Sequence, residues 1–73
     1  MSNLPRISGR ACVKALAAAG FLVLRQHGSH IILRRQEPFA QIVVPDHPEL
    51  DRGTLRAIIR QSGLTIDQFK GFL

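Results

Sequence analysis

The sequence predicts an α+β fold, in which two helices cover one face of a three-stranded antiparallel sheet and leave the other face open. Apolar residues recur with a helical period near both ends of the chain, and runs rich in β-branched residues occupy its middle. Glycine or proline residues separate these segments, as expected of turns and helix ends. A chain of 73 residues has room for one domain, which we assign to residues 1–73.

The first helix is expected over residues 8–19. Ser8 is a favourable N-cap, and Gly20 suits the left-handed position that follows a helix. The residues expected on the buried face are Val13, Leu16 and Ala17. Cys12 is predicted to be a small core side chain, and residues 1–7 are predicted to be loosely held.

Two strands joined by a tight hairpin are expected over residues 21–26 and 29–35. A two-residue turn at His27-Gly28 would place Arg25 opposite His30. Alternation along the strands then puts on the core face Leu22, Leu24, Ile31 and Leu33. The open face receives Phe21, Val23, Arg25, His30, Ile32 and Arg34. The prediction is therefore a histidine between two arginines, on a surface that a ligand can reach.

The remaining elements are a third strand and two helices. The strand is expected over residues 40–44, with Ile42 and Val44 facing the core. Asp51 is a suitable N-cap for the second helix, which Gly63 ends and whose buried stripe contains Leu55, Ile58 and Ile59. Thr65 opens a short last helix with a capping box, and its inward side chains are expected to be Ile66, Phe69 and Leu73. This α-β-β-β-α order, with an additional short C-terminal helix, is that of a double-stranded-RNA-binding-like sandwich.

The charge of the chain favours a polyanionic partner. Ten Lys and Arg residues oppose five Asp and Glu residues, for a net charge of +5. Arginine predominates, and its planar fork donates two hydrogen bonds to one phosphate. Nucleic acid is therefore favoured over a membrane surface, with simple solubility as the alternative.

Cysteine content and hydropathy indicate the compartment. The single Cys12 excludes an internal disulfide and a thiolate metal site. The chain has neither the ~20-residue apolar run that spans a bilayer nor the apolar segment of a signal peptide at its start. We therefore expect a cytoplasmic protein with no membrane partner.

Two motifs resemble one known family. Residues 25–30, Arg-Gln-His-Gly-Ser-His, resemble the R-Q-x-G-S-H signature of the HicA family of small toxin ribonucleases. Residues 44–50 and 53–64 are similar to that family's VPxHxEL and GTLRxILRQAGL segments. The resemblance extends over about residues 8–69. One departure is His27, which stands where another cation or polar residue is common.

The resemblance implies a fold, an activity and a partner. HicA proteins adopt a double-stranded-RNA-binding-like fold, cleave mRNA with the histidine of the Gly-Ser-His motif, and are neutralised by a HicB antitoxin. The matching histidine is His30. The resemblance implies no DNA binding by the toxin alone and no cofactor, and it identifies no second catalytic residue.

Chemistry without a metal would use the 2′-hydroxyl of RNA as the nucleophile, and His30 would act as general base or acid. Arg25 and Arg34 are expected to hold phosphate and stabilise the transition state. Gly28 serves the turn, and Ser29 orients His30, contacts phosphate or makes an ordinary turn hydrogen bond. A metal site formed by the three histidines of the chain is rejected, because they share no element with ligand spacing.

Several alternatives remain open from the residues. His30 could be an ordinary exposed sheet histidine instead of a catalytic residue. His27 could be a solvated turn residue or a second proton-transfer group. The ridge of Arg52, Arg56 and Arg60, with a spacing of four residues, suits RNA backbone, acidic residues of an antitoxin or solvent alone. For the whole protein, the competing functions are a non-catalytic RNA-binding module and an inert interaction domain.

Overall fold

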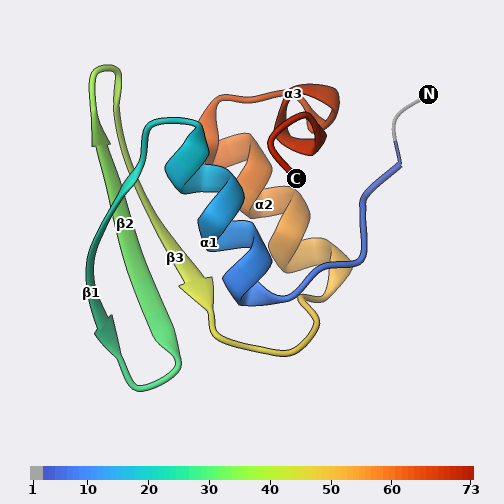
Figure 1. The fold of residues 1–73 in the computed structure, drawn as a ribbon, viewed down its shortest axis with the longest axis horizontal. Helices are drawn as coiled ribbons and strands as arrows, with labels where there is room; N and C mark the ends of the chain where they lie inside the picture. The colour runs from blue at the N-terminus through green and yellow to red at the C-terminus, as the bar shows by residue number, and fades with distance from the viewer. Residues whose placement is uncertain (1–2) are drawn as a thin grey trace.

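A computed structural model describes residues 3–73. Its elements are α1 (Gly9–Ala18), β1 (Leu22–His27), β2 (His30–Gln36), β3 (Phe39–Pro45), α2 (Arg52–Ser62) and α3 (Ile66–Lys70). The strands form one antiparallel sheet in the order β1-β2-β3. All three helices lie on the same side of this sheet (Figure 1). The predicted α-β-β-β-α sandwich with a short C-terminal helix is confirmed.

The predicted helix caps are present. The Ser8 hydroxyl accepts from the Ala11 N–H at the start of α1, and the Asp51 carboxylate accepts from the Thr54 N–H at the start of α2. Thr65 opens α3 with a capping box. Gly63 ends α2 with φ +81°, a left-handed value that only glycine adopts without strain. Local sequence signals therefore determine where each helix begins and where α2 ends.

The core lies between the sheet and the helices. Its largest fully buried apolar side chains are Phe21, Phe69, Leu16, Leu33, Ile42, Leu55 and Val44. Leu4 is also buried in this core, and the Ile7 carbonyl accepts a hydrogen bond from the Leu50 N–H. Residues 4–7 therefore differ from the loosely held lead that the sequence suggested, because Leu4 covers part of the core. Residues 1 and 2 lie outside the described part of the chain.

The hairpin turn lies one residue further along the chain than predicted, which moves the cross-strand partners by two residues. The turn consists of Gly28 and Ser29, so that His27 lies opposite His30 and Arg25 lies opposite Ile32. Gly28 has φ +57° and Ser29 does not have a positive φ, which matches a type II′ turn with glycine in its first position. The predicted turn would have required a positive φ at His27, which is unfavourable for a residue with a Cβ atom.

The shift of two residues leaves every side chain of β1 on its predicted face, because side chains alternate with a period of two. An irregularity between Val23 and Arg25 then changes the face of the start of β1, where Leu22 lies opposite Arg34. The prediction that Leu22 and Leu24 are core residues is wrong, because all six residues of this edge strand are exposed. Phe21, predicted on the open face, is buried just before the strand. Ile31 and Leu33 of β2 are core residues as predicted, whereas the C-terminal Leu73 is exposed.

Candidate active site

The tip of the β1–β2 hairpin brings two histidines together. His30 is the first residue of β2, and its partners across the sheet are His27 on β1 and Pro45 on β3. Both histidines are exposed. Residues directly opposite in an antiparallel pair point to the same face, with about 4.5–5.5 Å between their Cβ atoms. The two imidazoles therefore leave the open face of the sheet as neighbours.

The hairpin tip is attached to the loop that follows β3. The Ser29 carbonyl accepts a hydrogen bond of 2.6 Å from the Asp46 N–H. The Gln26 side-chain amide donates to the Gly28 carbonyl at 3.0 Å and to the Asp46 carboxylate at 3.1 Å. These bonds hold the turn against a neighbouring segment, which limits the movement of the strand ends that bear the histidines.

Asp46 also connects this end of the sheet to α1. The Arg10 guanidinium donates to both Asp46 carboxylate oxygens, at 3.1 and 2.8 Å. This bond from Arg10, with a smaller contribution from Gln26, lowers the pKa of the Asp46 carboxyl. The carboxylate therefore stays ionised near neutral pH and keeps its arginine. The sequence did not reveal this contact, because the two residues are 36 positions apart and lie on separate elements.

The two arginines predicted beside His30 have different positions. Arg25 lies opposite Ile32, one diagonal step from His30, and diagonal neighbours on a sheet are within reach of a long side chain. Arg34 is four residues further along β2, about 13 Å away at the usual rise of a strand. There it donates two hydrogen bonds to the Gln41 side chain. Arg25 is thus a diagonal neighbour of His30, and Arg34 lies further along the same face.

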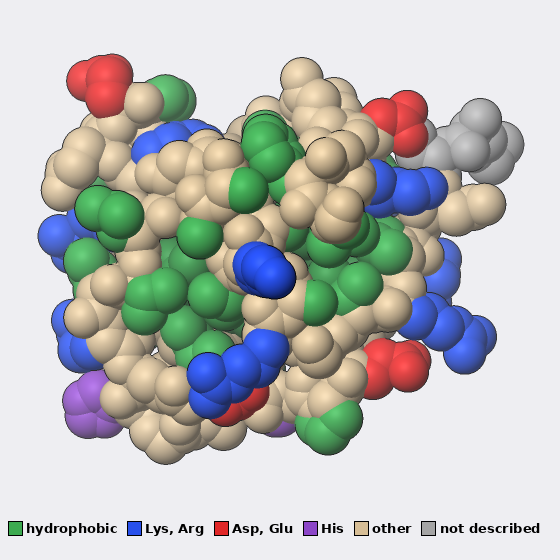
Figure 2. Space-filling model, in the orientation of Figure 1, with side chains coloured by type: hydrophobic (Ala, Val, Ile, Leu, Met, Phe, Trp, Pro, Cys, Tyr) green, Lys and Arg blue, Asp and Glu red, His purple; other side chains and the backbone are tan. Residues whose placement is uncertain are grey.

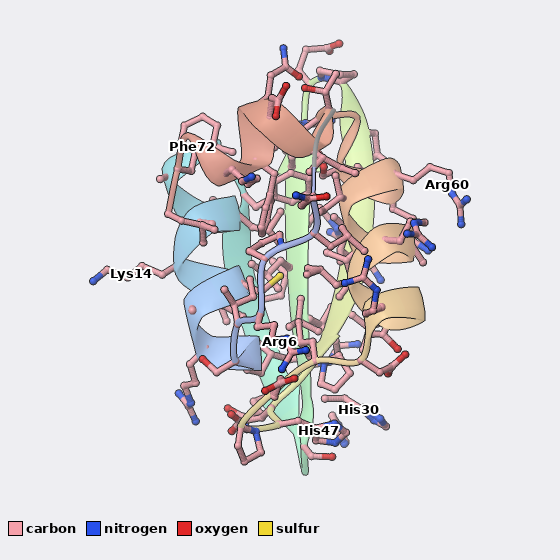
Figure 3. All side chains as sticks on the ribbon, turned by 90° about the vertical axis from the view of Figure 1, so that its right-hand side faces the viewer. Arg6, Lys14, His30, His47, Arg60 and Phe72 are labelled. Atoms are coloured by element: carbon pink, nitrogen blue, oxygen red, sulfur yellow. The ribbon has the colours of Figure 1, made fainter. Side chains whose placement is uncertain are left out.

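His47 is the third histidine, and it lies in the loop between β3 and α2. Its carbonyl accepts a hydrogen bond of 2.9 Å from the Gly9 N–H, which fastens the loop to the start of α1. Figure 3 shows His47 and His30 at the same end of the molecule. Within residues 3–73, no group of three histidine, cysteine or acidic residues is arranged to hold a metal ion.

The predicted arginine ridge forms an exposed face of α2. Its three members, Arg52, Arg56 and Arg60, are all exposed, and successive members are about 6 Å apart along the helix axis. Arg60 projects outward from the helix (Figure 3). Arg56 and Arg60 also line a shallow groove that continues over the start of α3. The ridge is therefore available to a ligand.

Two further features lie away from the histidines. An apolar groove runs beside α1, where hydrophobic and basic side chains appear together on the face drawn in Figure 2. Phe72 and Leu73 form its C-terminal side. Cys12 lies in the core, as predicted, and burial raises the pKa of its thiol to about 12. The thiol therefore stays protonated and is a poor nucleophile.

The fold and the site together define a small basic domain of the double-stranded-RNA-binding-like type, with a histidine pair at one end of its open sheet. A family model described as "HicA toxin of bacterial toxin-antitoxin" matches residues 9–64. Because this match covers most of the 73-residue chain, the protein belongs to the HicA toxin family. It is thus the toxin of a toxin–antitoxin system, with an antitoxin as its partner. No curated protein is significantly similar to the chain.

No helix in the described part of the chain is both long enough and apolar enough to cross a membrane.

Proposed function

We propose that this toxin is an endoribonuclease that cleaves mRNA in the cytoplasm without a metal, with His30 as a catalytic proton-transfer group. The main support is one observation: His30, the histidine of the Gly-Ser-His motif, is exposed at the hairpin tip of a HicA family member. The protein acts as a single domain. Its antitoxin is HicB-like, because that is the partner which the family resemblance implies.

The proposed reaction uses a nucleophile that RNA itself provides. The 2′-hydroxyl attacks the adjacent phosphate, and the bond from phosphorus to the 5′-oxygen breaks. One group must take the 2′-hydroxyl proton and another must protonate the leaving oxygen, and histidine does either near neutral pH. The products are a 2′,3′-cyclic phosphate and a free 5′-hydroxyl.

The groups proposed to bind the phosphate surround the hairpin tip. Arg25 is close enough to contact the phosphate that His30 acts on, and its guanidinium would stabilise the charge that develops there. Apart from Gly28 and its two chain neighbours, no residue has an atom within 4 Å of the place where a side chain at Gly28 would begin, so a phosphate could approach the turn and Ser29 closely. Arg34 would bind a phosphate further along the strand.

Cleavage of modified RNA is the most direct test of this function. An RNA oligonucleotide should be cut by the purified toxin in the presence of a chelator, and the same RNA with a single 2′-deoxy sugar at the mapped cleavage site should remain intact. Cleavage of the 2′-deoxy substrate at the normal rate would contradict the mechanism. Binding of both RNAs without cleavage would instead favour a non-catalytic RNA-binding module.

We also propose that Arg56 and Arg60 bind the RNA backbone. Replacing Arg56 by glutamate is expected to weaken RNA binding and to reduce its salt dependence, because fewer counterions are released on binding. Fluorescence anisotropy at several salt concentrations measures both effects. The matched control is Lys14→Glu, which makes the same charge change on the exposed side of α1, away from α2 (Figure 3).

The result separates two partners of the ridge. Equal RNA affinity in the two variants would contradict a role of Arg56 in RNA binding. If Arg56→Glu left RNA binding unchanged but weakened the complex with the antitoxin, the ridge would be a protein-docking surface.

A further inference from the structure

We infer that His27 is the second proton-transfer group of the active site, so that His27 and His30 form an acid–base pair. This inference rests on the proposed ribonuclease function. It adds the group that the reaction requires and that neither the motif nor the family resemblance supplies.

The observation behind it is the hairpin register. His27 and His30 flank the two-residue turn and lie directly opposite each other, on the same open face and both exposed. At about 5 Å between Cβ atoms, the two imidazoles can reach opposite sides of one phosphate group. In phosphoryl transfer the attacking and leaving oxygens lie roughly in line, on opposite sides of phosphorus. The pair thus has the spacing that a separate base and acid need.

The hairpin also restrains the pair. Only two residues, Gly28 and Ser29, lie between the strands, and the Ser29 carbonyl accepts a hydrogen bond of 2.6 Å from the Asp46 N–H. The side chain of Gln26, the residue before His27, adds bonds to Gly28 and Asp46. Positioned groups of this kind contribute to catalysis because little further ordering is needed when the substrate binds.

Other described side chains near the tip are less suited to proton transfer. Arg25 stays charged at any physiological pH and can neither accept nor release a proton. The Asp46 carboxylate is held by Arg10 through two hydrogen bonds. His47 lies in a separate loop, the one between β3 and α2. The strand register fixes His27 opposite His30, but it does not fix His47 relative to His30.

The proton balance of the paired mechanism is complete. The neutral histidine takes the proton of the 2′-hydroxyl as the 2′-oxygen forms its bond to phosphorus. The protonated histidine gives its proton to the 5′-oxygen as the phosphorus–oxygen bond breaks. After the product leaves, the two histidines exchange their protons with water and return to their initial states, so that no metal or other co-reactant is consumed.

Two substrates test the inference on the variants His27→Ala and His30→Ala. On ordinary RNA, each variant is expected to cleave about 10²- to 10⁴-fold more slowly than the wild type. The second substrate is the same RNA with sulfur in place of the bridging 5′-oxygen at the mapped site. A thiolate leaves without being protonated, since thiols are much more acidic than alcohols. The variant that lacks the acid should recover a rate close to that of the wild type on this substrate, and the variant that lacks the base should not.

Rescue of one variant alone supports the pair and identifies the acid. Rescue of both variants or of neither contradicts it, as does a wild-type rate for His27→Ala on ordinary RNA.

His47→Ala is the comparison variant. A large loss of cleavage activity in His47→Ala, with normal activity in His27→Ala, would assign the second proton transfer to His47 and overturn the inference. If the wild type cut no RNA or His30→Ala were fully active, the proposed function itself would fail. Circular dichroism spectra of His27→Gln and His27→Ala that match the wild type exclude a loss of folding as the cause of slower cleavage.

Discussion

Replacing His30 by alanine is expected to reduce the rate of RNA cleavage by about 10²- to 10⁴-fold, the usual effect of removing a group that transfers a proton. Expression of the variant without antitoxin should no longer stop growth. The fold should be unaffected, because the side chain of His30 is exposed and lies outside the core. Single-turnover cleavage of a labelled RNA measures the rate, and thermal unfolding measures the stability.

Gln36→Ala is the matched control for this variant. It removes an exposed polar side chain from the other end of the same strand, about 20 Å from His30 at the usual strand rise. The control should keep the wild-type rate. If the cleavage rate of His30→Ala were within a few-fold of the wild-type rate, His30 would not be catalytic, whatever the rate of the control variant.

Replacing Gly9 by alanine is expected to lower the free energy of unfolding by about 1–3 kcal/mol, the usual range for overpacking in a close-packed interior. A Cβ atom at this buried position would lie 1.9 Å from the Pro45 carbonyl oxygen, so α1 and the end of β3 would have to move apart. The hydrogen bond from the Gly9 N–H to the His47 carbonyl would be strained at the same time. Urea unfolding measures the loss.

Gly53→Ala is the control for this change. Gly53 lies in the first turn of α2, where a Cβ atom would have only an ordinary contact of 3.5 Å with the Asp51 carboxylate. Alanine is the better helix former, so this variant should be more stable than the wild type by up to about 1 kcal/mol. Equal stability of Gly9→Ala and Gly53→Ala would contradict the close approach of α1 to β3.

The Gly9 variant should also affect the site. The backbone that it displaces, at Pro45, precedes Asp46, which bonds to Ser29 at the hairpin tip. We therefore expect slower RNA cleavage even at temperatures where the variant is folded.

Much of the fold could be predicted because its signals are local. Ser8, Asp51 and Thr65 each bond to a backbone N–H three residues away, so the chain near each cap contains all the information that the cap needs. The same holds for the apolar stripe of α2, which repeats with the period of the helix. The motif that contains His30 is also contiguous, and for that reason the candidate site could be located in the sequence.

The hairpin register shows the limit of such reasoning. A Gly-Ser turn and a His-Gly turn differ by one residue and both join the same two apolar runs, but they place different side chains opposite His30. The irregularity near Leu24 then shifts the pairing again within β1. Neither feature can be recognised from the periodicity of the sequence, and the irregularity breaks the alternation that had assigned Leu22 and Leu24 to the core.

The sequence by itself determined the order of the elements, the helix caps, the basic charge and the motif histidine, since each depends on residue type and short-range spacing. Only the tertiary structure decided which side chain faces His30, how Arg10 and Asp46 connect α1 to the hairpin tip, and why Gly9 admits no side chain. These features depend on contacts between residues up to 36 positions apart in the chain. Such contacts exist only after the sheet and helices have packed, because packing alone brings distant backbone and side-chain groups within bonding distance.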